Sequence, residues 1–341
     1  MNFNFSGTGV ALITPFRKQG TIDFSTLESV VESFVEAKVD YIVVLGTTSE
    51  AATMNSKEKA AIIDNVLEIV DNRLPIVLGM GGNNTLEVVD KIKQTDFTGI
   101  SGILSVSPYY NKPQQRGIYL HYKSIAEVSP VPVIMYNVPG RTASNMTAET
   151  TLQIAEEFSN IVAIKEASGN MSQVMQIIRN KPEHFSVISG DDALTLPMMA
   201  AGAIGVISVI ANAFPKQMSE MVNYCLKHDF ESALPLHYKL LPLMNAIFEE
   251  GNPAGVKAAM EAKGLISNHL RLPLVKVSKP LYTKISGLID ELENSKYNDS
   301  LFAGSQETFC RRLVCNPNHR YRDCRGGRVV CQVYAPSCCQ A

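Results

Sequence analysis

A lysine at the end of an apolar run is the residue of this sequence best suited to do chemistry. Lys165 follows residues 161–164 (IVAI), a run typical of a buried strand, so its side chain is expected to emerge into a sheltered site. Burial disfavours the ammonium form and lowers the pKa of a lysine, which leaves more neutral amine to attack a ketone. The sequence therefore predicts Schiff-base chemistry at Lys165. The ordinary alternatives are a lysine that reaches solvent or one that pairs with Glu166.

Phenol, hydroxyl and guanidinium groups stand at the ends of other apolar runs. Tyr136 could relay protons if a hydroxyl partner such as Thr47 stabilised its changes of charge, or it could be a core tyrosine. Thr47 and Thr48 could instead cap the next helix. Tyr110 suits a surface aromatic or a protruding contact with another subunit, and Arg141 suits a carboxylate fork or a solvated charge. Together with Lys165, these groups indicate a polar rim.

Eight short apolar runs would position this rim. The predicted strands are 9–14, 41–45, 75–79, 102–106, 132–136, 161–165, 185–189 and 204–209. Their composition is nearly continuously apolar, as in parallel strands covered on both faces. No glycine-rich dinucleotide turn follows the first run, which argues against a doubly wound sheet.

Amphipathic segments alternate with these runs. Helices are predicted at 25–37, 56–70, 115–129 and 147–158, with Thr147 and Thr150 as candidate caps of the last one. The alternation predicts an α/β fold, a (β/α)8 TIM barrel over residues 1–212. Residues 213–297 contain only helical patterns and predict a C-terminal helical bundle. Barrel enzymes place catalytic groups at the carboxyl ends of their strands, where the polar residues above fall.

Several segments in order resemble the dihydrodipicolinate synthase family, also called 4-hydroxy-tetrahydrodipicolinate synthase. They are 46–50 (GTTSE), 107–113 (SPYYNKP), 136–142 (YNVPGRT), 164–169 (IKEASG) and 189–192 (SGDD). The resemblance runs from about Thr8 to Leu292. Ser49 replaces the glycine that is commoner in the family, a small change that should leave both threonines usable.

The resemblance implies a Schiff-base lyase of lysine and diaminopimelate biosynthesis. Lys165 would condense with pyruvate, and the resulting enamine would attack L-aspartate-4-semialdehyde to give 4-hydroxy-tetrahydrodipicolinate. No metal or organic cofactor would be needed, because the lysine itself supplies the electron sink. Family members are usually homotetramers, described as dimers of dimers.

The resemblance also implies a role for each matching residue. Tyr136, Thr47 and Tyr110 match the proton relay, with Tyr110 expected from a neighbouring subunit. Thr48 would hold the pyruvate carboxylate and Arg141 the semialdehyde carboxylate at the entrance. The backbone around Gly190 and Ile207 would complete the pocket.

Some family members bind lysine at the dimer interface as a feedback inhibitor. Asn83, Glu87 and Tyr109 match that allosteric pocket, with Ala51 at its edge. Ser56 and Lys59 stand where lysine-sensitive members often carry histidine or an acidic group. A cation at Lys59 should repel a lysine ligand, so we expect weak or absent inhibition.

Two other functions fit part of the sequence. N-acetylneuraminate lyase and the keto-deoxy-sugar-acid aldolases share the lysine and the tyrosine, although Arg141 directly after 138–140 (VPG), together with Tyr110, favours the synthase. A non-enzymatic alternative is a barrel that serves as an oligomeric carrier for the C-terminal segment.

The composition excludes several classes of protein. The chain has 341 residues, is 45% apolar and 19% charged, and carries a formal net charge of −2, which gives no electrostatic case for nucleic acid or an anionic membrane. The first residues lack the pattern of a signal peptide, and apolar stretches such as 203–214 are too short for a transmembrane helix. A cytoplasmic barrel is expected, since only Cys225 precedes residue 300.

The C-terminal segment 306–341 predicts a different kind of module. After a linker at 298–305 it is dense in cysteine: Cys310, Cys315, Cys324, Cys331, Cys338 and Cys339. From residue 305 onward, six Arg and two acidic residues give +4, so the preceding body carries −6 of the total of −2. This composition favours a disulfide knot that needs an oxidising environment, with a zinc site using His319 as the rival. Gly304-Ser305 resembles a fusion junction, and the segment's function and partner cannot be assigned.

Overall fold

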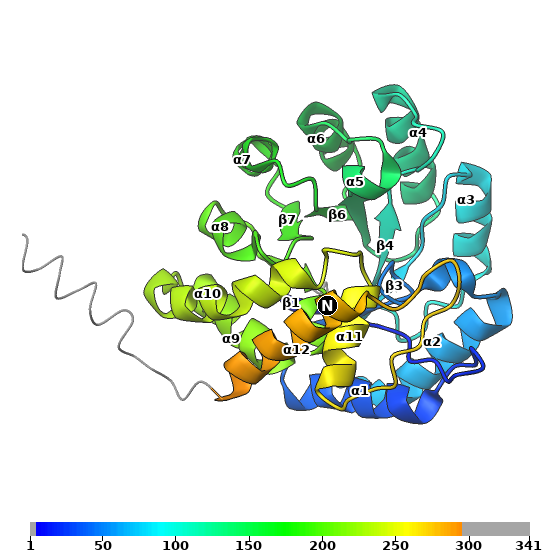
Figure 1. Ribbon diagram of the computed structural model, residues 1–341. Coiled ribbons are helices and arrows are strands. Elements are labelled where there is room, and N and C mark those ends of the chain that lie inside the picture. The colour runs from blue at the N-terminus through cyan, green and yellow to red at the C-terminus, as the bar shows by residue number, and fades with distance from the viewer. Residues whose placement is uncertain (1–4, 295–341) are drawn as a thin grey trace, which may run out of the picture. The chain divides into compact units, whose positions relative to one another are not determined.

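Eight parallel strands close into a barrel in chain order, β1 to β8 (Figure 1). The structure is a computed structural model and describes residues 5–294. The strands are β1 (Gly7–Ala11), β2 (Tyr41–Val44), β3 (Ile76–Gly79), β4 (Gly102–Val106), β5 (Val133–Asn137), β6 (Ile161–Glu166), β7 (Ser186–Ser189) and β8 (Gly205–Ser208). Pairing of β1 with β8, with Gly9 opposite Ile207, completes the ring. The predicted (β/α)8 barrel is confirmed.

The first strand begins and ends earlier than its apolar run predicted. Residues 12–14 remain buried, and the N–H of Leu12 still donates to the carbonyl of Val43 in β2 (3.0 Å), but the N–H of Ile13 donates to the side-chain oxygen of Asn212 (3.0 Å) and not to a backbone carbonyl. At the other end Gly7 and Thr8 join the sheet by pairing with β8. The prediction of 9–14 was wrong by two to three residues because a side chain took over the hydrogen bond of an apolar segment.

Helices follow the strands and cover the outside of the barrel (Figure 1). They are α1 (Phe24–Glu36), α2 (Ser56–Val70), α3 (Thr85–Gln94), α4 (Gln115–Ala126), α5 (Pro139–Thr142), α6 (Ala148–Glu157), α7 (Met171–Asn180) and α8 (Thr195–Ala200), with short 3-10 turns η1 (Ala51–Thr53) and η2 (Ile210–Asn212). Thr147 caps α6 as predicted, by accepting a hydrogen bond from the N–H of Thr150. Thr150 is therefore a residue of the first turn and not a cap, and that part of the prediction was wrong.

Between β8 and Asn294 the chain forms helices and contains no further strand, as predicted. It forms α9 (Pro215–Leu226), α10 (Phe230–Ala246), α11 (Ala254–Ala262) and α12 (Lys279–Asn294). Helix α9 packs against β1, and α11 and α12 pack against each other (Figure 1). Apolar side chains of these helices, such as Met218, Val256 and Ile285, belong to the same core as the helix-facing side of the strands. Residues through Asn294 form one compact unit. The predicted linker, the six cysteines of the C-terminal segment and the end of the predicted helical domain lie outside the described residues.

Alternation along the strands sorts side chains between the barrel interior and the helix layer. Ala163 of β6 and Ile134 and Tyr136 of β5 belong to the interior cluster, whereas Ile164 belongs to the outer core. Lys165, two residues after Ala163, therefore points inward, and its neighbour Glu166 points toward the helices. No helix within residues 5–294 has the length and apolar character needed to cross a membrane.

Candidate active site

Lys165 lies at the carboxyl end of β6, inside the barrel and 5% exposed. The register of β5 and β6 places it opposite Tyr136, and its Nζ lies 4.5 Å from the centroid of the tyrosine ring. Burial lowers the pKa of Lys165 to about 8, with a further lowering by the charge of Arg141 and an opposing effect of Asp192. A lysine with this pKa offers far more neutral amine near pH 7 than an exposed one.

Glu166 does not neutralise the lysine. Its buried carboxylate accepts hydrogen bonds from Asn137 Nδ2 (3.0 Å), Gln173 Nε2 (3.0 Å) and the backbone N–H of Ser168 (2.7 Å). These donors come from β5, α7 and the loop between β6 and α7, on the outer side of the barrel. The alternative that Lys165 pairs with Glu166 is therefore wrong, and so is the alternative that it reaches solvent.

Tyr136 is a buried phenol held in its protonated form. Burial raises its pKa to about 12, and the positive charge of Arg141 opposes this only in part. At neutral pH the hydroxyl is therefore a proton donor, as a relay beside a reacting amine requires. Thr47, its predicted relay partner, is exposed in the turn after β2.

The threonine turn, residues 46–50 between β2 and η1, is hydrogen-bonded to a residue far along the chain, Asn252. Thr48 is 2% exposed, and its Oγ1 accepts a hydrogen bond from Asn252 Nδ2 (3.0 Å). The guanidinium of Arg141 donates to the backbone carbonyl of Asn252 (3.3 Å). The contacts of Asn252 thus connect Thr48 with Arg141. Neither threonine caps the following helix, because Asn55 caps α2.

Asn252 was not found by sequence reasoning. It lies in the connection from α10 to α11, far along the chain from both Thr48 and Arg141. Nothing in its local sequence points to the barrel, so only the packing of α11 reveals its position.

Strands β7 and β8 complete the surroundings of the lysine. A Cβ on Gly190 would lie 2.8 Å from the Cβ of Ala167 and 3.0 Å from the Cε of Lys165, so only glycine leaves the lysine stem its space. Asp192 is buried, and its Oδ2 accepts from the backbone N–H groups of Val209 (3.0 Å) and Ile210 (2.7 Å). Burial raises its pKa, although these hydrogen bonds oppose the rise. Ile207 is buried in β8 and belongs to the barrel interior, as the predicted pocket requires.

Tyr110 does not lie buried beside these groups. It stands in the loop between β4 and α4, 87% exposed and with a left-handed backbone (φ +74°), and Tyr109 beside it is 40% exposed. The structure thus presents both tyrosines at the surface of the chain.

The residues that match the allosteric pocket lie on neighbouring segments. Ala51 opens η1, Ser56 opens α2, Asn83 precedes α3 and Glu87 lies in its first turn. Lys59 of α2 is partly buried, and burial together with the charge of Lys91 on α3 lowers its pKa. These residues therefore lie along the α2–α3 side of the barrel, where Lys59 and Lys91 already bring two positive charges.

The fold and the site define a class of protein. A (β/α)8 barrel with a buried, weakly basic lysine at the carboxyl end of a strand, beside a protonated tyrosine, is the arrangement of a class I aldolase-type lyase. Comparison with known proteins narrows the class. The sequence matches the Dihydrodipicolinate synthetase family over residues 4–292, and the chain belongs to this family.

Individual relatives agree with this assignment. The 4-hydroxy-tetrahydrodipicolinate synthase of Parabacteroides distasonis is 52% identical over 291 residues, which cover 85% of this chain and 98% of that protein. The enzyme of the same name from Flavobacterium psychrophilum is 52% identical over 281 residues, which cover 82% of this chain and 96% of that protein. The crystal structure of dihydrodipicolinate synthase from Thermotoga maritima superposes on this chain with a TM-score of 0.83 at 40% sequence identity. The superposition covers 85% of this chain and 99% of that one. The family match ends before the cysteine-dense segment.

Proposed function

We propose that the chain condenses pyruvate with L-aspartate-4-semialdehyde to form 4-hydroxy-tetrahydrodipicolinate, in lysine and diaminopimelate biosynthesis. The observation that carries this proposal is the buried Lys165, with a pKa of about 8 and its Nζ 4.5 Å from the Tyr136 ring, in a chain 52% identical to relatives named for this reaction. The lysine supplies the electron sink, so the chemistry needs neither metal nor organic cofactor.

The reaction follows from the state of these two groups. The neutral amine of Lys165 attacks the ketone carbon of pyruvate, and Tyr136 donates a proton as water leaves to give the Schiff base. Loss of a methyl proton gives the enamine, whose carbon attacks the aldehyde carbon of the semialdehyde. The amino group of the second substrate then attacks the imine carbon, closes the ring and releases Lys165 as the free amine.

The carboxylates of the two substrates, pyruvate and the semialdehyde, would be held on either side of Asn252. Thr48, fixed by Asn252 Nδ2, would bind the carboxylate of pyruvate, and the exposed guanidinium of Arg141 would receive that of the semialdehyde. Gly190 leaves space for the lysine adduct, and the backbone near Ile207 would close the pocket. Thr47 would complete the proton relay with Tyr136.

The exposure of Tyr110 supports a homo-oligomer, a tetramer by analogy with the family. A tyrosine that is 87% exposed can enter the site of a neighbouring subunit, as the resemblance implies. Mixing a Lys165→Met chain with a Tyr110→Phe chain tests this directly. Mixed oligomers should regain part of the activity that each variant lacks, because one site in the mixture would combine an intact lysine with an intact tyrosine. No gain above the sum of the two variants would contradict the shared site.

Weak inhibition by lysine is proposed for the α2–α3 side of the barrel. The positive charges of Lys59 and Lys91 would repel a cationic ligand near Glu87 and Asn83. An inhibition titration should show little effect of lysine in the wild type and a stronger effect in Lys59→Glu. Strong inhibition of the wild type would contradict the proposal.

A coupled assay decides between the synthase and its relatives. Purified protein should consume pyruvate only when aspartate semialdehyde is added, and it should not cleave N-acetylneuraminate or a keto-deoxy-sugar acid. Cleavage of a sugar acid without turnover of the semialdehyde would favour the other aldolases. Inactivity toward all of them, in a folded oligomer, would favour the carrier alternative.

We propose a cytoplasmic location for the barrel and a separate, disulfide-bonded module for residues 306–341. The measurement for the module is an intact mass under non-reducing conditions, compared with the mass after reduction. A difference of six protons would support three disulfides among its six cysteines. No difference would point to free or metal-bound thiols.

A further inference from the structure

A fully buried ion pair lies next to the threonine turn, outside the site described above. Nζ of Lys257 on α11 lies 2.6 Å from Oε1 of Glu50, and neither side chain is exposed (0%). The ammonium also donates to the carbonyl of His269 (2.9 Å) and lies 4.4 Å from the centroid of the Phe16 ring. The Lys257 ammonium thus joins two segments near the start of the described chain to two segments near its end.

Glu50 fixes the backbone at the end of the turn. It directly follows Thr47, Thr48 and Ser49, and its own backbone is left-handed (φ +59°), a conformation that a residue with a side chain keeps only when its surroundings impose it. Its N–H donates to the carbonyl of Thr47 (3.1 Å). Its second carboxylate oxygen accepts from the backbone N–H of Arg271 (3.0 Å). Both carboxylate oxygens of Glu50 therefore have partners that fix the end of the turn, Oε1 with Lys257 and Oε2 with the N–H of Arg271.

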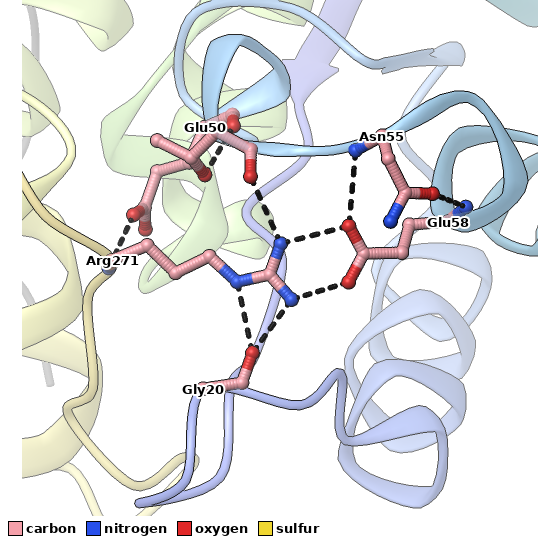
Figure 2. A network of polar contacts seen from close by, with 6 residues as sticks. Gly20, Glu50, Asn55, Glu58 and Arg271 are labelled. Atoms are coloured by element: carbon pink, nitrogen blue, oxygen red, sulfur yellow. Dashed lines mark hydrogen bonds and ion pairs between the residues drawn. The ribbon is translucent and has the colours of Figure 1, made fainter.

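Arg271 extends the network to the neighbouring loops, as Figure 2 shows. Its guanidinium donates to both oxygens of Glu58 (2.5 and 3.0 Å), to the carbonyl of Gly20 (2.6 and 2.8 Å) and to the carbonyl of Thr53 (3.1 Å). Glu58 in turn accepts from the N–H of Asn55 in the capping box of α2 (3.0 Å). Arg271 is thus bonded on both sides of η1, to Glu50 through its backbone N–H and to Glu58 through its guanidinium.

Two residues of the segment 252–257, one just before α11 and one within it, contact the turn. Asn252, just before the helix, donates to Thr48, and Lys257, just over one helical turn further, binds Glu50. The turn that carries Thr47 and Thr48 is therefore held at its middle and at its end by one short segment, residues 252–257.

A buried ion pair is a poor way to gain stability, because apolar side chains of the same volume would do as well or better. It does define geometry, since each hydrogen bond of a buried charge has a required direction. We propose that Glu50, Lys257 and Arg271 form a positioning network that sets the Thr47–Thr48 turn for catalysis, an inference that rests on the proposed roles of these threonines. None of the three is a catalytic residue.

The test compares Glu50→Gln, Lys257→Met and the double variant Glu50→Gln/Lys257→Met. Each single change keeps the shape and removes one charge. We expect the KM for pyruvate to rise by about tenfold to a hundredfold, since a small displacement of a binding group has effects of this size. The KM for aspartate semialdehyde should change much less. Amide hydrogen exchange over residues 46–54 should become faster.

A matched control separates positioning from general destabilisation. Val222→Ala removes buried methyl groups from α9, away from the turn, and should lower the melting temperature without changing either KM. The double variant removes both charges, so it should regain stability relative to Lys257→Met while its KM for pyruvate stays high. If it regains wild-type kinetic constants together with stability, the pair is only structural and the proposal is wrong.

Two further measurements keep the test decisive. If Lys257→Met does not fold, Arg271→Lys keeps a charge but cannot bind Glu58, Gly20 and Thr53 together, and we expect a rise of about threefold to tenfold in the KM for pyruvate. If the rate of amide hydrogen exchange over residues 46–54 is unchanged in all folded variants, the proposed positioning network is wrong. A wild type that never forms a pyruvate adduct would instead contradict the proposed function, and the exchange data would still decide whether the network holds the turn.

Discussion

Two buried lysines of this protein have opposite surroundings. Lys165 and Lys257 both lie over an aromatic ring, with Nζ 4.5 Å and 4.4 Å from the ring centroids of Tyr136 and Phe16. Lys257 has a carboxylate oxygen of Glu50 at 2.6 Å. Lys165 forms no ion pair with any residue in the range 5–294, and its pKa is about 8.

The difference shows that burial alone does not make a lysine reactive. Burial lowers the pKa of both side chains, and for Lys257 the adjacent charge and hydrogen bond of Glu50 oppose this lowering in part. Lys257 is also sealed by its neighbours, whereas Lys165 stands at the carboxyl end of a strand, where a barrel receives its substrate. A reactive lysine thus needs a buried position, no carboxylate in contact and access from the barrel mouth.

The largest expected effect separates the two lysines by activity. Lys165→Met should abolish trapping, which is the covalent labelling of the protein by pyruvate when cyanoborohydride reduces the Schiff base. It should also lower turnover by at least about a thousandfold, because no other group supplies the covalent amine. Its folding stability should be unchanged or slightly higher, since a desolvated ammonium is removed. A steady-state assay together with urea denaturation checks both. Turnover within tenfold of the wild type would contradict the role of Lys165.

The second-largest effect distinguishes Lys257 from Lys165 by its contribution to folding stability. Lys257→Met should lower the free energy of unfolding by about 3–5 kcal/mol, because Glu50 would be left as a buried, uncompensated charge. Urea denaturation measures the loss, and trapping at saturating pyruvate should still label Lys165. A loss below about 1 kcal/mol would show that Glu50 finds another partner or takes up a proton.

A smaller effect tests the space around Lys165. Gly190→Ala would bring a Cβ within 3.0 Å of the lysine Cε, so we expect the trapping rate to fall by about tenfold to a hundredfold. Gly287→Ala is the matched control, because a Cβ there meets no atom within 4 Å in the middle of α12. It should leave the rate unchanged and stabilise the protein by about 0.5–1 kcal/mol. Equal rates in both variants would refute the packing argument.

The smallest effect lies in the pH profile. Only the neutral amine attacks pyruvate, so the trapping rate should rise with pH and level off above the pKa of Lys165, about 8. The charge of Asp192 raises this pKa, so Asp192→Asn should move the inflection to lower pH, by less than about one unit. Stopped reactions between pH 6 and pH 10 measure the profile. An inflection near the pKa of an exposed lysine would show that Lys165 is not desolvated.

Much of the fold was predictable because its signals are local. Continuous apolar runs marked the strands, and a lysine directly after one of them marked the inward-facing position beside Tyr136. The limits of β1 were not predictable, because the hydrogen bond from Ile13 to Asn212 joins residues at opposite ends of the barrel sequence.

The network around the threonine turn was missed for the same reason. Asn252 and Lys257 lie about two hundred residues after the turn and meet it only through the packing of α11. Lys257 carried a weak signal, since it is the one charge in residues 253–260 (PAGVKAAM). A lysine inside such an apolar helix must find a partner, but the sequence does not say that the partner is Glu50.

The most direct test of the central claim is to incubate the protein with pyruvate, reduce it with cyanoborohydride and map the labelled peptides by mass spectrometry. The expected result is one reduced adduct per chain, on Lys165, with the peptide that carries Lys257 unlabelled. An adduct on another lysine, or none on folded protein, would contradict the assignment of Lys165 as the reactive amine.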